Sequence, residues 1–196
     1  MEAASMHGSR YCDNPYKTEM IDVLKIVQLA APSPKHNRVV VNITQILGRH
    51  FKGKSCQVFA EGVEVHLFND DDYVMPDLLV LCDPNKIKDN GIYGSPDLIA
   101  EVLSPSTANM DRGRKKELYA KAGVKEYWIV DHNAKSVEVH VLDNEQYVLD
   151  YVYYVFNDYD FEGMTEEKKE SFRFTIISPA FPELSIELSE VFEHIR

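Results

Sequence analysis

The chain has 196 residues, of which 44% are hydrophobic and 27% charged, an ordinary composition for one globular domain with a substantial core. Its formal net charge of −11 argues against a protein that coats nucleic acid through its bulk field, because phosphate binding depends on Lys and Arg. Contact with a polyanion must therefore be local or bridged by cations.

We expect no targeting signal in the N-terminal sequence. It has no basic stretch followed by an apolar one, and the apolar runs elsewhere are too short to span a bilayer. Cys12, Cys56 and Cys82 are odd in number and widely spaced, which indicates neither a disulfide framework nor a zinc site. We therefore expect a cytoplasmic protein with no membrane contact.

The first clear elements are a helix and a hairpin. Ser33 can cap a helix and Pro34 suits its first position, and apolar residues at three-and-four spacing extend this helix to about residue 51. The apolar runs 56–60 and 63–68 follow, with a Glu-Gly turn between them. This arrangement is typical of a β-hairpin.

Two short apolar strands come next, and each carries a carboxylate. They cover residues 76–82 and 97–103, with Asp77 near the start of the first and Glu101 within the second. Acids rarely lie in buried strands unless they are paired or hold a metal. If the strands are neighbours in a sheet, both side chains come within reach of one ion. Alternatively, Asp77 forms an Asx-turn and Glu101 pairs with a nearby cation, and spacing alone leaves both readings open.

A second helix is predicted over residues 111–122. Lys115 falls on its core-facing stripe, where a lysine is unusual, and Tyr119 lies one turn further along. Lys116 is about 100° around the helix and is better placed for solvent. An ammonium beside two acids and a bound cation can stabilise the charge that develops in phosphodiester hydrolysis.

The remaining chain is predicted to extend the sheet. Strands fit residues 126–131, 136–142 and 147–156, residues 157–171 form a charged surface excursion, and a strand and a short strand or helix close the chain. The core order is helix, three strands, helix, strand. We therefore predict an α/β fold with a mixed sheet (α+β) and extra antiparallel strands.

Three stretches carry a resemblance to a known family: PDLLVLCDP, GSPDLIAEVLSPST and DRGRKKELYAKAGVKEYWIVD. They closely resemble the restriction-endonuclease family that is widespread among uncharacterised bacterial proteins, a branch of the PD-(D/E)XK nuclease superfamily with the same core order. The resemblance implies one restriction-endonuclease-like domain over residues 20–196, with residues 1–19 as an N-terminal extension. It also implies a metal-dependent endonuclease that hydrolyses DNA with Mg²⁺ or Mn²⁺.

The resemblance also assigns residue roles. Asp77 and Glu101 would be catalytic metal ligands, together with the backbone carbonyl of Val102. The family pattern places a lysine two residues after the second acid, but that position is Leu103. The matching basic residue of this branch is Lys115, which the helical stripe also indicates.

Three further residues are candidates for lining the site. His36 matches the branch and lies on the apolar stripe of the first helix, Asp97 has the same strand parity as Glu101, and Tyr119 could hydrogen-bond nearby. Each also has an ordinary structural interpretation, as a hydrogen-bonded core histidine, a turn residue and a packed aromatic, respectively.

Arg112, Arg114 and Lys116 form a local basic patch that could contact nucleic acid, although a solvated helix face has the same pattern. Two other functions stay open: a binding or regulatory protein with a weak site, and a phosphoester hydrolase whose substrate is not DNA. Because one site cuts one strand and two-fold dimers are the commonest assemblies, we expect a homodimer. Light scattering that gives a 22.5 kDa monomer at micromolar concentration would contradict this expectation.

Overall fold

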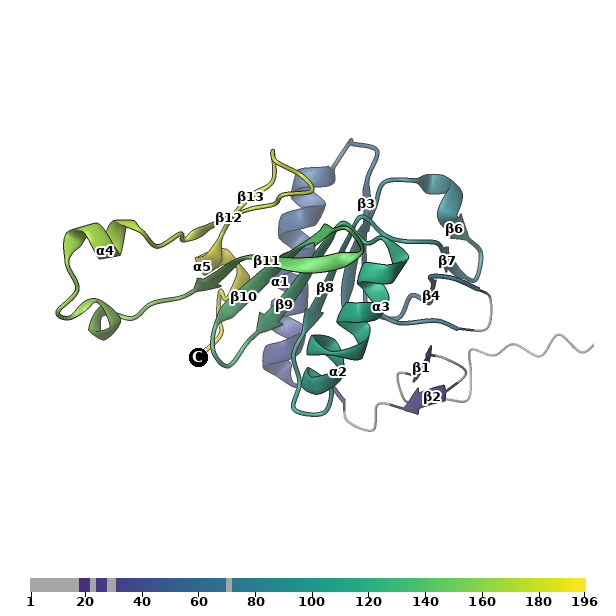
Figure 1. Ribbon diagram of the computed structural model, residues 1–196, viewed down its shortest axis with the longest axis horizontal. Coiled ribbons are helices and arrows are strands. Elements are labelled where there is room, and N and C mark those ends of the chain that lie inside the picture. The colour runs from purple at the N-terminus through teal and green to yellow at the C-terminus, as the bar shows by residue number, and fades with distance from the viewer. Residues whose placement is uncertain (1–17, 22–23, 28–30, 70–71) are drawn as a thin grey trace, which may run out of the picture.

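A six-stranded mixed sheet forms the centre of the computed structural model, which describes residues 18–21, 24–27, 31–69 and 72–196 (Figure 1). The strand order is β11-β10-β9-β8-β5-β3. The strands are β3 (Gln57–Ala60), β5 (Leu78–Leu81), β8 (Leu98–Val102), β9 (Glu126–Asp131), β10 (Ser136–Asp143) and β11 (Gln146–Tyr154). Strands β8 and β9 run parallel, and the other neighbouring pairs run antiparallel.

Helices cover both faces of this sheet. The long helix α1 (Pro34–Phe51) lies on one face, and α2 (Ala108–Arg112) and α3 (Arg114–Ala122) lie on the other (Figure 1). The Ser33 side chain caps α1 by accepting a hydrogen bond from the His36 N–H, as its sequence predicts. The single helix predicted over residues 111–122 is interrupted, because Gly113 leaves the helical region at φ −110° and ψ −101°.

Side chains alternate between the two faces along each strand. Leu78, Val80 and Ala100 pack on the face toward α1, whereas Leu79 and Ile99 belong to the core on the face toward α3. By the same alternation, the side chains of residues 77 and 101 belong to the α3 face. Sheet and helix therefore bring the two predicted acids to the helix that carries the predicted lysine.

The predicted fold class and core order are confirmed, since α1, β3, β5, β8, α3 and β9 follow one another in that order. The predicted hairpin was wrong. Strand β3 pairs with β5, while β4 (Val65–His66) pairs in parallel with β7 (Gly91–Tyr93), which in turn pairs with β6 (Ile87–Lys88). Strand β5 can pair with β3 along all four of its residues, whereas β4 has only two residues.

Cys56 and Cys82, for which the sequence indicated no disulfide, are joined by one. The pairing of Gln57 with Leu81 at the ends of β3 and β5 places the two cysteines opposite each other. This disulfide depends on the pairing of β3 with β5. The sequence predicted a different partner for β3, so it did not indicate the disulfide.

Smaller elements surround the sheet. They are β1 (Thr18–Ile21) and β2 (Leu24–Val27) near the N-terminus, a 3₁₀ helix (Pro84–Lys86), a second 3₁₀ helix (Asp158–Phe161), α4 (Glu166–Glu170), β12 (Thr175–Ile177), β13 (Ser185–Glu187) and α5 (Leu188–Val191). The segment with α4 projects away from the sheet (Figure 1), and the Phe156 and Phe172 rings hold its two ends together at 4.6 Å. Within the described residues, no helix is both long and apolar enough to cross a membrane.

Candidate active site

Asp77 and Glu101 meet across the β5–β8 pair. The register pairs Leu78 with Ala100, so its continuation places residue 77 opposite residue 101. The Asp77 N–H donates to Glu101 Oε2 at 3.4 Å, and the Val102 N–H donates to Asp77 Oδ2 at 2.9 Å. Both side chains are buried, with 5% of Asp77 and 2% of Glu101 exposed. Asp77 and Glu101, which were expected to share a metal ion, are therefore side by side. Val102, whose carbonyl was expected to be a further ligand, is next to them.

Helix α3 presents Lys115 and Tyr119 to Glu101. Lys115 Nζ lies 3.1 Å from Glu101 Oε1, and the Tyr119 hydroxyl donates to the same oxygen at 2.7 Å. Lys115 is 1% exposed, whereas Lys116 is only half-buried. The predicted helical phase therefore matches the structure, and Tyr119 contacts a site residue as well as packing in the core.

The charges around Lys115 fix its protonation state. Burial lowers the pKa of this ammonium, but the carboxylates of Glu101, Glu19 and Asp111 together outweigh burial and hold the pKa well above its usual value. Burial, followed by the charge of Glu101, likewise raises the pKa of Tyr119 well above its usual value. At neutral pH the first group is a cation that cannot accept a proton, and the second is a phenol that donates.

Two buried acids beside Lys115 were missed by the sequence analysis. Glu19, from β1, is 0% exposed and places Oε1 2.8 Å from Lys115 Nζ, and that oxygen also accepts the Met75 N–H at 3.0 Å. Asp111, four residues before Lys115, lies 3.6 Å from the same nitrogen. Residue 19 was assigned to an N-terminal extension, yet it contributes to the centre of the candidate site. Asp111 could have been found from its spacing, because residues four apart on a helix are neighbours and Lys115 was already a candidate. Nothing in the sequence around Glu19 indicated its role.

Strand β1 reaches the site through backbone pairing. The N–H and carbonyl of Met20 both bond to Tyr73, each at 2.8 Å, and Tyr73 lies just before the segment that leads to Asp77. This pairing fixes the strand that carries Glu19 against the segment that leads into β5. Long-range contact of this kind has no signature in the sequence of either segment.

The site holds more buried negative charge than its own cation balances. Among the described residues, the carboxylates of Glu19, Glu101 and Asp111 pair with the ammonium of Lys115, and Asp77 lies beside Glu101. All five side chains are at most 5% exposed. Among the described residues, Glu19 Oε2 and Asp111 Oδ1 have no hydrogen-bond donor. Burial raises the pKa of Asp111 although Lys115 opposes that shift. Such an excess is costly without a proton or another cation.

His36 and Glu61 extend the site at the edge of the sheet. His36 Nε2 lies 3.2 Å from Asp77 Oδ2, and its Nδ1 lies 3.8 Å from Glu61 Oε1. Among the described residues, one ligand atom from each of these three side chains lies within 4.8 Å of the others, a spacing that could hold a metal ion. The His132 ring is 6.4 Å from the His36 ring, and burial, aided by His36, lowers the pKa of His132. His36 therefore lies where the sequence placed it, and Glu61 was missed.

Asp97 is not part of this site, so the prediction that it lines the site was wrong. Its carboxylate accepts the Cys82 N–H at 2.8 Å and pairs with Lys125 at 2.8 Å. Four residues separate it from Glu101 along a strand that rises about 3.3 Å per residue, which places it at the opposite end of β8. The alternation of side chains along the strand gives Asp97 the same face as Glu101, but Asp97 lies at the end of β8 away from the site.

The predicted basic patch is partly neutralised by neighbouring groups. Arg112 forms an ion pair with Glu138 at 2.8 Å, and Arg114 donates to the carbonyl of Ile21 at 3.4 Å. Burial lowers the pKa of Lys116, and the charge of Glu138 opposes this shift. Contact of these residues with nucleic acid stays a prediction.

Residues 10–187 match the Uma2 family, described as "Putative restriction endonuclease". This match covers most of the chain and includes Glu19 as well as the two strands and the helix that form the site. The protein belongs to the Uma2 family. The match confirms the family resemblance that the strand and helix motifs carry.

Two proteins of Synechocystis sp. strain PCC 6803 are similar to this Uma2 chain. The uncharacterized proteins slr1290 and sll1609 are each 29% identical to it over 117 residues, which cover 59% and 58% of the chain. The aligned regions span 62% and 66% of those proteins, less than two thirds of their lengths.

A solved structure shares the fold of this Uma2 protein. The crystal structure of a putative nuclease belonging to DUF820 from Anabaena variabilis aligns with a TM-score of 0.68 and covers 91% of each chain. The sequence identity is 17%, so this likeness concerns the fold alone.

Proposed function

We propose that the protein is a divalent-metal-dependent endonuclease that hydrolyses DNA phosphodiesters. The observation that carries this proposal is a buried cluster in which Glu19, Glu101 and Asp111 pair with Lys115 and Asp77 lies beside Glu101. Among the described residues of this cluster, four carboxylates accompany one ammonium. Membership of a family described as putative restriction endonucleases supports the nuclease class. The choice of DNA as the substrate is part of the proposal.

The donor set fits a hard divalent cation. Asp77 and Glu101 would hold Mg²⁺ or Mn²⁺ with the Val102 carbonyl, since carboxylate and carbonyl oxygens are the ligands these ions prefer. When bound, such an ion supplies Lewis-acid activation of the phosphate and lowers the pKa of a coordinated water. The imidazole of His36, next to Asp77, would favour Mn²⁺ over Mg²⁺ as an additional ligand.

The chain's own residues would stabilise the transition state. Hydrolysis joins a water oxygen to phosphorus and breaks one P–O ester bond, while the attacking water loses a proton to solvent and the leaving oxygen takes one up from solvent. Negative charge grows on the phosphoryl oxygens and the leaving oxygen during this step. Lys115 would stabilise this charge as an ammonium, because the carboxylates of Glu101, Glu19 and Asp111 hold its pKa well above the usual value. Tyr119 would hold Glu101 in place through its hydrogen bond.

The proposed setting is a cytoplasmic homodimer in which two sites cut the two strands of a duplex. An acidic chain with a net charge of −11 would need the cation of the site to offset repulsion from DNA phosphates. Activity should therefore depend strongly on the divalent ion.

A cleavage assay tests the proposal. Single-stranded, double-stranded and branched DNA should be cut with Mg²⁺ or Mn²⁺, and EDTA should abolish the activity. Cleavage of a simple phosphodiester such as bis(p-nitrophenyl) phosphate without cleavage of any DNA would favour a hydrolase with another substrate. Metal binding with neither activity would favour a binding or regulatory protein.

The Glu19→Gln substitution is expected to lower turnover by about 10- to 100-fold, the range for losing an outer-shell partner. The carboxylate lies 2.8 Å from Lys115 Nζ, so its loss releases the ammonium from one of its charged partners. The affinity for the metal should change little, because Glu19 acts through Lys115. Steady-state kinetics and metal titration measure the two effects separately, and Glu167→Gln on the exposed face of α4 is the control. A large loss of metal affinity without loss of turnover at saturating metal would contradict this positioning role.

A further inference from the structure

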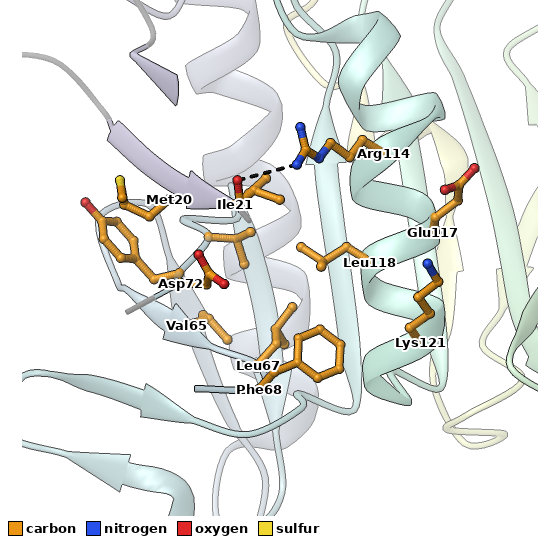
Figure 2. Close-up of a pocket in the computed structure, with 12 residues that line it drawn as sticks. Met20, Ile21, Val65, Leu67, Phe68, Asp72, Arg114, Glu117, Leu118 and Lys121 are labelled. Atoms are coloured by element: carbon orange, nitrogen blue, oxygen red, sulfur yellow. Dashed lines mark hydrogen bonds between the residues drawn. The ribbon is translucent and has the colours of Figure 1, made fainter. Parts of the chain in front are cut away.

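A cavity of about 260 Å³ lies beside the candidate active site (Figure 2). It is open to solvent on one side and is lined by residues of β1, of the segment from β4 to Val74, and of α3. The lining residues are Met20, Ile21, Val65, Leu67, Phe68, Asp72, Tyr73, Val74, Arg114, Glu117, Leu118 and Lys121. Its walls therefore combine three segments that are distant in the sequence.

The cavity has an apolar interior and a charged rim. Ile21, Val65 and Val74 are buried in its floor, while Phe68 is 57% exposed. Figure 2 shows Phe68 and Leu118 projecting from opposite walls toward the same space. An exposed phenyl ring at the mouth of an apolar hollow offers a flat stacking surface.

Helix α3 supplies cations at both ends of the rim. Arg114, Leu118 and Lys121 are spaced by four and three residues, so they lie on one face of the helix. The two cations are seven residues apart, about 10.5 Å along the helix axis. Asp72 and Glu117 add carboxylates to the lining. The cavity thus presents a hydrophobic slot with hydrogen-bond acceptors and positive charge at its rim.

The cavity and the active site share their walls. Ile21 follows Glu19 by two residues, Val74 immediately precedes Met75, and Arg114 immediately precedes Lys115. On α3, consecutive residues are turned by about 100°, so Arg114 and Lys115 present adjacent faces of one helical turn to the cavity and to Glu101. A ligand in the cavity would contact residues that are next to, or two positions from, Glu19 and Lys115 in the sequence.

We propose that this cavity binds one unpaired nucleobase of the strand that is cut. The inference rests on the proposed function and narrows the substrate to single-stranded DNA or to duplexes with an unpaired or flipped nucleotide. The base would stack on Phe68 and donate its amino hydrogens to Asp72 or Glu117, while Arg114 and Lys121 contact the flanking phosphates. A base in an intact duplex is stacked and paired and cannot enter such a slot without being extruded.

Fluorescence of 2-aminopurine tests the inference. A single-stranded oligonucleotide with one 2-aminopurine is titrated with the protein in Ca²⁺, with the strand checked for integrity on a gel. The Phe68→Ala substitution should weaken binding by about 5- to 150-fold, because base–aromatic stacking contributes in that range, and should remove the fluorescence change. Since Phe68 is largely exposed, its truncation leaves the core intact.

Phe174→Ala is the matched control, because Phe174 is also exposed (44%) but lies outside the cavity lining. Equal binding of the oligonucleotide by wild type and Phe68→Ala, or equal losses for both variants, would overturn the inference. If no DNA is cut by the wild type but Phe68→Ala alone loses oligonucleotide binding, the proposed function fails while the base site stands. If DNA is cut and Phe68→Ala binds and cuts like the wild type, the base site alone fails.

Discussion

Replacing Lys115 with alanine is expected to lower metal-dependent cleavage by about 10²- to 10⁴-fold, the range for losing a general acid–base or charge-stabilising group. Lys115 Nζ lies 3.1 Å from Glu101 and 2.8 Å from Glu19, and no other lysine among the described residues forms an ion pair with these acids. The affinity for Mg²⁺ should be nearly unchanged, because Lys115 is not a ligand. Single-turnover rates at saturating metal measure the chemical step directly.

The same substitution should also destabilise the metal-free protein, by about 3–5 kcal/mol for breaking a buried ion pair from one side. It leaves three acids, Glu19, Glu101 and Asp111, without their common cation. Cleavage must therefore be compared at a temperature where circular dichroism shows the variant folded. Divalent metal should restore part of the lost stability, since it supplies positive charge to the same cluster.

Lys116→Ala is the control for Lys115, because the neighbouring lysine differs only in helical phase. Lys116 faces away from Glu101 toward Glu138, so its loss should cost some affinity for phosphates and little turnover. That loss should fade as salt is raised. Cleavage that survives Lys115→Ala but is abolished by Lys116→Ala would contradict the assigned roles.

The part of the site that the sequence predicted depends on regular local patterns. Asp77 and Glu101 stand out because they lie in apolar strands, and Lys115 stands out because it lies on the core stripe of a helix. His36 lies on the apolar stripe of α1, and the family resemblance made it a candidate. Periodicity drew attention to the two acids and the lysine, and their roles were assigned by the resemblance.

The part that was missed depends on long-range pairing. Glu19 reaches Lys115 only because Met20 pairs with Tyr73, and Glu61 reaches His36 only because β3 pairs with β5. Short strands have several possible partners, and the choice is made by the packing of the whole sheet. The sequence indicated β3 and β4 as a hairpin for this reason, and the disulfide between Cys56 and Cys82 was missed with it.

Glu101→Gln is expected to weaken Mg²⁺ or Mn²⁺ binding by more than about 100-fold, beyond the 10- to 100-fold typical of outer-shell partners. The amide keeps the shape of the side chain but loses the charge that a hard cation requires. Cleavage at low metal concentration should be lost, and excess Mn²⁺ should restore only part of it. Isothermal titration calorimetry measures the metal affinity without any substrate.

The stability of the metal-free protein separates this variant from Lys115→Ala. Glu101→Gln removes one of the three buried carboxylates that pair with Lys115 among the described residues, so it reduces the negative charge of the cluster. We therefore expect the metal-free variant to lose much less stability than Lys115→Ala, and to gain less from added metal than the wild type does. Asp97→Asn is the matched control, because Asp97 immediately precedes the same strand and bonds Cys82 and Lys125 at the other end. It should leave metal affinity unchanged. Equal losses of metal affinity for both variants would mean that the acids act through the fold of β8, and the assigned metal site would then be wrong.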